Sequence, residues 1–79
     1  MKTVRALLNT NANRKQMGNH SMAKTVVGRD FTYHWTVICS VNDIERTFTT
    51  NNGGWNTSST NRAINAYRYE LTARGYREV

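Results

Sequence analysis

A run of alternating side chains at residues 31–41 restricts the fold of this chain more than any other feature. Every second position carries an apolar, aromatic or sulfur-containing side chain: Phe31, Tyr33, Trp35, Val37, Cys39 and Val41. The positions between them are Thr32, His34, Thr36, Ile38 and Ser40. Because neighbouring side chains of a strand point to opposite faces, this period of two predicts one half-buried strand whose aromatic side faces the core.

A second strand is expected to follow and to end near Thr50, giving a hairpin over residues 31–50. Asn42-Asp43 suits a two-residue turn between the two strands, because both residue types tolerate positive φ. A turn at this place fixes the register across the apolar face: Val41 with Ile44, Val37 with Phe48 and Trp35 with Thr50.

Residues 60–74 show the spacing of a helix with one apolar side. The expected buried positions are Thr60, Ala63, Ile64, Tyr67 and Leu71. Thr57, Ser58 or Ser59 can cap the start of this helix, and Gly75 suits the left-handed position that follows a helix. Residues 76–79 can return as a short final strand.

The beginning of the chain fits two elements. Residues 2–8 match a strand through the alternation of Val4, Ala6 and Leu8. They also match a short helix, with Val4, Leu7 and Leu8 on one side. We favour the strand.

Residues 9–23 are rich in Asn and contain little to bury, so we expect a mobile polar loop there. The whole chain, residues 1–79, is expected to form a single α+β domain. Its small antiparallel sheet consists of the hairpin at 31–50, with room for added N-terminal and C-terminal strands. One C-terminal helix packs on one face, in the order β-β-α or β-β-α-β.

The chain is strongly basic, with 11 Lys and Arg residues against 5 Asp and Glu residues and a net charge of +6. Most of these cations are Arg, whose planar guanidinium suits phosphates and carboxylates. We therefore expect a polyanionic partner, either nucleic acid or an acidic surface on another protein. The alternative is a solvated surface that only keeps the protein in solution.

The sequence argues against membrane proteins, metal proteins and enzymes. No apolar run approaches the ~18 residues of a membrane span. Cys39 is the one cysteine and can form no internal disulfide, which in so small a chain favours a reducing cytoplasm. Cys39, His20 and His34 lack the paired spacing of a zinc site, and the acidic residues are scattered. We expect a cytoplasmic, non-enzymatic protein with no metal, no cofactor and no membrane partner.

The candidate nucleic-acid contacts lie mainly on the outer face of the expected helix. Arg62 and Tyr69 project away from its apolar side, with Asn65 and Arg68 on the flank. Side chains of these types contact phosphates and base edges. The full candidate set is Arg14, Lys15, Arg62, Asn65, Arg68, Tyr69, Arg74 and Arg77. An ordinary solvated helix face is the competing interpretation.

Gly53, Gly54 and Trp55 precede the expected helix and form a second candidate site. Backbone N–H groups in such a loop, together with the helix N-terminus, can attract an anion. Trp55 can stack on a base or fold down as a lid over the core. We favour the lid, because a small domain has a use for every large apolar ring.

The other face of the 31–41 strand is expected to stay open, flanked by Thr47 and Thr49. A flat, Thr-rich face suits a protein contact or a homodimer, and a sheet edge can pair with a partner strand.

The order of hairpin, polar loop and helix over residues 31–74 resembles the C-terminal part of double-stranded-RNA-binding domains. The similarity rests on Val41-Asn42-Asp43 and on the transition from loop to helix. It implies RNA contacts from the hairpin turn and the helix start. The basic cluster that opens the last helix of that family is replaced here by Thr57-Ser58-Ser59-Thr60.

These features favour a small basic protein that binds nucleic acid through Arg–phosphate contacts. The alternative function is that of a phage-type accessory protein. Such a protein binds an acidic surface on a host protein and inhibits or modulates that host protein.

Overall fold

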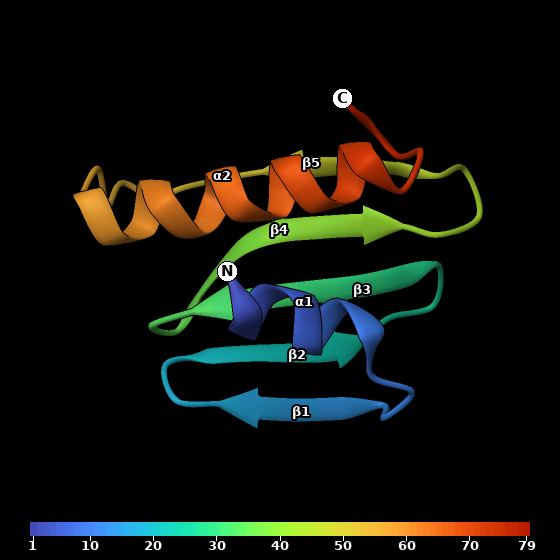
Figure 1. Cartoon of the computed structure of the whole chain (residues 1–79), viewed down its shortest axis with the longest axis horizontal. Helices are drawn as coiled ribbons and strands as arrows, with labels where there is room; N and C mark the ends of the chain where they lie inside the picture. The colour runs from blue at the N-terminus through green and yellow to red at the C-terminus, as the bar shows by residue number, and fades with distance from the viewer.

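A computed structural model describes all residues of the chain, Met1–Val79, as an α+β fold (Figure 1). The elements in chain order are α1 (Lys2–Asn9), β1 (Arg14–Met17), β2 (His20–Lys24), β3 (Gly28–Tyr33), β4 (Thr36–Asn42), β5 (Thr47–Thr50), α2 (Ser58–Ala73) and β6 (Arg77–Glu78). The strands form one six-stranded sheet in sequence order, antiparallel throughout except for the parallel pair β5–β6. The expected α+β class is confirmed, but the sheet is larger than a hairpin with flanking strands.

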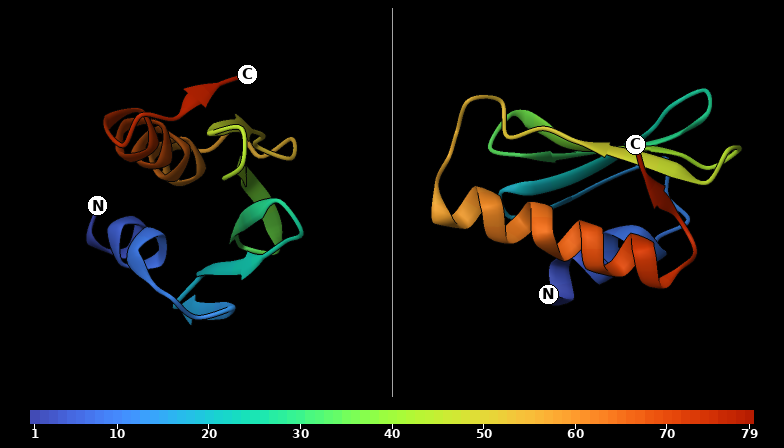
Figure 2. Two further views of the ribbon diagram at one scale, coloured as in Figure 1. Left: turned by 90° about the vertical axis from the view of Figure 1, so that its right-hand side faces the viewer. Right: turned by 90° about the horizontal axis from the view of Figure 1, so that it is seen from above.

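Both helices lie on the same side of the sheet (Figure 2). Helix α1 packs over β1 and β2, and α2 packs over β4 and β6. Between the helices and the sheet lies one core of 13 buried apolar residues. The opposite face of the sheet carries no helix, as expected. Thr32 and Ser40 lie on that face, because they alternate with the buried Phe31 and Cys39.

Helix α2 agrees closely with its sequence prediction. The Thr57 hydroxyl caps the helix by accepting a hydrogen bond from the Thr60 N–H at 3.3 Å. Gly75 follows the helix with a φ of +89°, a conformation that glycine adopts without steric cost. The five residues expected to be buried are all buried. The short final strand is also present, as β6.

The run at residues 31–41 is not one strand, because the chain reverses direction within it. His34 and Trp35 form a two-residue turn with φ values of +48° and +69°, and Tyr33 pairs with Thr36 across it. Two positive φ values are typical of the tightest hairpin turns, which prefer Asn-Gly. The aromatic alternation gives no sign of such a turn. Trp35 was expected in the core but is 96% exposed at the tip of the β3–β4 hairpin.

A second expectation, strict alternation along residues 36–41, fails because β4 contains a β-bulge. Phe31 pairs with Cys39 and Thr32 with Val37, which leaves Ile38 without a partner in β3. The extra residue shifts the alternation, so that Ile38 and Cys39 are both buried although they are neighbours. The predicted place of Ile38 on the open face was therefore wrong.

The hairpin between β4 and β5 exists, but its register differs from the prediction. Val41 pairs with Phe48 and not with Ile44, and residues 43–46 form the loop. The Asn42 side chain favours this longer loop, since its Oδ1 accepts hydrogen bonds from the N–H groups of Ile44 and Glu45.

The N-terminal third also departs from expectation. Residues 2–9 form helix α1, with Val4, Leu7 and Leu8 buried, so the helical alternative is correct. The predicted mobile loop at 9–23 contains strand β1 and the start of β2, joined at Gly18. Backbone pairing with β3 and the burial of Met22 stabilise this hairpin, although few of its side chains are apolar. No helix of the structure has the length and apolar character needed to cross a membrane.

Candidate functional site

Two tryptophan side chains lie exposed at one end of the molecule. Trp35 belongs to the β3–β4 turn, and Trp55 belongs to the segment before α2. In Figure 1 both segments lie at the left, beside the start of α2. Trp55 is 62% exposed, so the prediction that it folds over the core as a lid was wrong. Neither ring contributes to the core.

Contacts with the neighbouring hairpin hold the turn that presents Trp35. The His34 N–H donates a hydrogen bond to the Asn19 carbonyl at 3.1 Å, which joins the β3–β4 turn to the β1–β2 turn. The Tyr33 ring contacts two imidazoles, with ring centroids 4.6 Å from His20 and 4.3 Å from His34. The turn therefore has a defined position although Trp35 itself is in solvent.

Asparagine side chains shape the segment that presents Trp55. Asn51 and Asn52 accept hydrogen bonds through Oδ1 from the N–H groups of Gly53 and Gly54, each at 2.9 Å. The Trp55 N–H then donates to the Asn52 carbonyl at 2.9 Å. A Cβ on Gly53 would lie 2.5 Å from the Thr36 side chain, so this loop packs directly against the start of β4. This close approach brings Trp55 to the end of the molecule that carries Trp35.

The two rings flank a cavity of about 430 Å³, which we call the aromatic pocket. Its lining residues are Tyr33, His34, Trp35, Thr36, Asn52, Trp55, Thr57, Ser59 and Thr60. Aromatic walls with hydroxyl and amide groups between them are typical of a site for a flat ring with polar edges. The pocket is large enough for a nucleobase or a group of similar size.

A second cavity, of about 560 Å³, adjoins the aromatic pocket. We call it the asparagine groove, and its lining residues are Thr50, Asn51, Asn52, Asn61, Ile64, Asn65 and Arg68. Asn52 lines both cavities, so they meet at the loop before α2.

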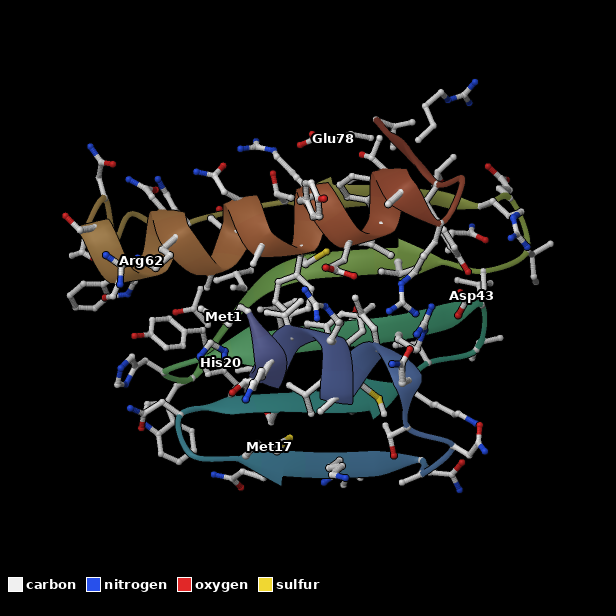
Figure 3. All side chains as sticks on the ribbon, in the orientation of Figure 1. Met1, Met17, His20, Asp43, Arg62 and Glu78 are labelled. Carbon is white, nitrogen blue, oxygen red and sulfur yellow. The ribbon has the colours of Figure 1, made fainter.

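Only part of the predicted contact set lies at the aromatic pocket and the asparagine groove. Asn65 and Arg68 line the asparagine groove, and Gly53, Gly54 and Trp55 lie in the adjoining loop. Arg62 is exposed on α2 at the same end of the molecule as His20, as Figure 3 shows. The fold therefore brings Asn65, Arg68 and the loop residues together, whereas Arg62 lines neither cavity.

The other predicted contacts are dispersed. Arg14 and Lys15 lie on β1 and Arg77 on β6, at opposite edges of the sheet. Tyr69 is exposed on α2 outside both cavities. Arg74 contacts Glu70 at 3.7 Å and donates a hydrogen bond to Asn9 Oδ1. The eight predicted contacts therefore do not form one basic patch.

Sequence reasoning missed Trp35 as a candidate contact, yet a signal was present. An uninterrupted strand of the length of the 31–41 run exceeds the usual strand of about 5–6 residues. A turn inside the run was therefore worth considering, and His34 and Trp35 stand near its middle. The exposure of both tryptophans follows from that turn and from the loop that Asn51 and Asn52 shape.

The titratable groups near the site do not form a metal centre. The structure has no group of three or more His, Cys, Asp or Glu side chains placed to hold a metal ion.

Burial, together with the charge of His34, lowers the pKa of His20, whose Nδ1 is buried without a hydrogen-bond partner. Burial and then the charge of Glu78 raise the pKa of the Cys39 thiol to about 12, so it stays protonated at neutral pH.

Comparison of the chain with protein-family models, with curated proteins and with solved structures finds no match. Any functional conclusion therefore rests on the geometry of the two cavities and on the charge of the chain.

Proposed function

We propose that this protein binds single-stranded nucleic acid, with an unstacked base held in the aromatic pocket. The observation that carries the proposal is the pair of exposed rings, Trp35 and Trp55, beside one pocket in a chain of net charge +6. Aromatic platforms combined with positive charge are the usual means by which proteins bind single strands. A paired base in a duplex cannot reach such a pocket without leaving its stack.

Folding alone gives no reason for a tryptophan at position 35. Its ring is in solvent, and its positive φ is costly for any residue with a side chain. Strain of this kind concentrates at functional sites. A base stacked on an aromatic side chain contributes about 1–3 kcal/mol of binding free energy, which provides a use for the exposed ring.

Long-range electrostatics supplies the second part of the proposal. Four of the Arg residues, Arg5, Arg29, Arg68 and Arg74, contact carboxylates within the chain. Arg62 makes no such contact and lies at the end of the molecule that carries the pocket (Figure 3). It is the predicted Arg residue near the pocket whose charge no carboxylate compensates. Binding is therefore expected to weaken as salt is raised.

The proposal is tested by titrating the protein with fluorescently labelled twelve-nucleotide strands of thymidylate and uridylate, and with a duplex, at low and moderate salt. We expect the single strands to bind more tightly than the duplex. Trp35→Ala and Trp55→Ala should each lower the affinity by about tenfold. Tyr69→Ala is the matched control, because Tyr69 is an exposed aromatic residue outside the pocket.

Two results would overturn the proposal. One is the absence of binding to every strand even at low salt. The other is equal affinity of the wild type and both tryptophan variants. A loss confined to Tyr69→Ala would instead support the outer face of α2, which the sequence alone had suggested.

A separate surface favours a second candidate function, the binding of an acidic protein. Val26, Val27 and Ile44 are all exposed, and the Asp43 N–H donates to the Val27 carbonyl at 2.9 Å, so the two loops that carry them are neighbours. Exposed aliphatic clusters of this kind mark protein contacts. Two cations, Lys24 and Arg46, stand near this patch in the sequence and are exposed, against one exposed acidic residue, Glu45. A protein retained after nuclease treatment by the wild type and by Trp35→Ala, but not by Ile44→Glu, would support this function.

A further inference from the structure

The asparagine groove contains neither tryptophan, but it shares Asn52 with the aromatic pocket. We propose that this groove binds the sugar–phosphate backbone of the same strand through neutral hydrogen-bond donors. The inference rests on the proposed function, since it assigns the path of the strand whose base enters the aromatic pocket.

The orientation of two carboxamides in the groove is fixed by the loop. A backbone N–H can only donate, so the atoms of Asn51 and Asn52 that accept from Gly53 and Gly54 must be the oxygens. The Nδ2 groups of both residues make no hydrogen bond within the chain. Each therefore has two donors available to a ligand.

A third carboxamide is fixed in the same way on α2. Asn65 Oδ1 accepts a hydrogen bond from Arg68 Nη1 at 3.2 Å, which leaves the Asn65 Nδ2 group free. Arg68 also donates through Nε to Glu78 and through Nη2 to Thr50, at 2.9 Å and 3.1 Å. A guanidinium has five N–H groups, so Arg68 retains donors beyond those that it uses here.

The groove is rich in donors but has little net charge. Glu78 compensates the charge of Arg68 at 2.9 Å, and the hydrogen bond from Arg68 lowers the pKa of Glu78, so the carboxylate is ionised at neutral pH. A ligand that suits this groove carries many acceptors. Phosphate and sugar oxygens fit this description, and Asn side chains commonly contact them.

Contacts of this kind position a strand without reading its sequence. They also differ from Arg–phosphate pairs in their response to salt, because a neutral amide displaces no counterion. The groove should therefore contribute affinity that depends neither on the bases nor on the salt concentration. The charge of Arg62 is not paired with a carboxylate, so Arg62 should instead contribute affinity that falls as the salt concentration rises.

The test measures the binding of labelled twelve-nucleotide thymidylate and adenylate strands over a range of potassium chloride concentrations. Asn65→Ala removes the free Nδ2 group and also the Oδ1 that accepts from Arg68. Ala is favourable at a helix position and Arg68 keeps its bonds to Glu78 and Thr50, so the fold should be retained. We expect this variant to lose about 3- to 10-fold in affinity for both strands, with an unchanged slope of log affinity against log salt. Arg62→Ala should reduce that slope by about 0.7, the value for one phosphate contact on a single strand.

Two further variants complete the design. Asn52→Asp keeps the oxygen that the turn requires and replaces the donor by a negative charge, so it should weaken binding more than Asn65→Ala does. Thr72→Ala is the matched control, because Thr72 is exposed on α2 and lies outside the groove.

The outcomes separate the groove from the pocket. If Asn65→Ala and Asn52→Asp bind like the wild type while Trp35→Ala does not, the proposed function stands and the groove inference fails. If the loss for Asn65→Ala depends on the base, the groove reads bases, and the assignment to the backbone is wrong. If no strand binds the wild type, the proposed function and the inference both fail.

Discussion

Tyr67 lies at the centre of the core with 0% of its surface exposed, and its hydroxyl has no hydrogen-bond partner. Its ring packs on Phe31 with the centroids 4.7 Å apart, so the aromatic body contributes to the core while the hydroxyl does not. Burial raises the pKa of Tyr67 above its ordinary value. An unpaired buried hydroxyl opposes folding.

Tyr67→Phe is therefore expected to raise the free energy of unfolding by about 1 kcal/mol, because it removes the unpaired group and keeps the ring. Urea denaturation followed by circular dichroism measures the change. Tyr67→Leu serves as the control and should destabilise, since it loses the contact with Phe31. A loss of stability in Tyr67→Phe would mean that the hydroxyl is satisfied in solution.

Cys39 gives a second prediction at the scale of single residues. Its thiol is buried and its pKa is raised to about 12, first by burial and then by the charge of Glu78. A thiol reagent such as dithionitrobenzoate should therefore not modify Cys39 in the native protein at pH 8, but should modify it fully in concentrated urea. Rapid modification without denaturant would show that β4 opens readily.

At the scale of elements, success in prediction depended on whether the deciding signals were local. Helix α2 has its spacing, its cap at Thr57 and its terminating Gly75 all in its own sequence, and it was predicted almost residue by residue. The candidate site was predicted only in part. Asn65 and Arg68 were named, but Trp35 was assigned to the core because the turn at His34 and Trp35 contains neither Gly nor Asn.

The wrong choice of a strand for residues 2–8 was a local ambiguity, because both a strand and a helix pattern fit them, but two other misses have a non-local origin. The pairing of β1 and β2 depends on backbone hydrogen bonds with β3, which no apolar pattern announces. The burial of Ile38 depends on a bulge whose position is set by β3 and not by β4 alone. Long-range pairing decided these elements, and side-chain periodicity does not contain that information.

The β3–β4 turn gives the prediction at this scale. Replacing His34-Trp35 by Asn-Gly supplies residues that adopt positive φ easily, so the free energy of unfolding should rise by about 1 kcal/mol. The same change should lower the affinity for single-stranded oligonucleotides by about tenfold, because it removes the Trp35 ring. Thermal denaturation and the strand titration described above measure the two effects. A variant that is less stable would show that the ring of His34 against Tyr33 matters more than backbone strain.

At the scale of the whole molecule, the proposed site and the strongest ionic cluster lie at opposite ends. Asp43 accepts hydrogen bonds from Arg29 at 2.8 Å and 3.0 Å and from the Tyr76 hydroxyl. Arg29 also donates to the Leu8 carbonyl at 3.0 Å. The cluster thus connects the end of α1, strand β3, the β4–β5 loop and the C-terminal segment. Figure 3 shows Asp43 at the end of the molecule away from Arg62 and His20.

Asp43→Asn should therefore lower stability without changing the proposed site. Burial alone would raise the pKa of Asp43, but the hydrogen bonds from Arg29 and Tyr76 outweigh it and lower the pKa below its usual value of 3.8. A carboxylate whose pKa is lower in the folded state stabilises the fold above pH 4, and this contribution is lost as the pH falls through the folded-state pKa. At pH 7 the variant should lose about 1–2 kcal/mol, since the pair is only partly buried.

The pH profile distinguishes this cluster from His20. The pKa of His20 is lowered from 6.5, so the unfolded chain takes up its proton first, and stability should already decline as the pH falls below 6.5. Urea midpoints between pH 8 and pH 3 should therefore fall in two stages. The first should be absent in His20→Gln, and the second should be smaller in Asp43→Asn but still present, because the pKa of Glu78 is also lowered. Asp43→Asn should bind oligonucleotides like the wild type under conditions where it is folded. A difference between wild type and Asp43→Asn that persists undiminished at pH 3 would mean that the charge of Asp43 does not hold these four segments together.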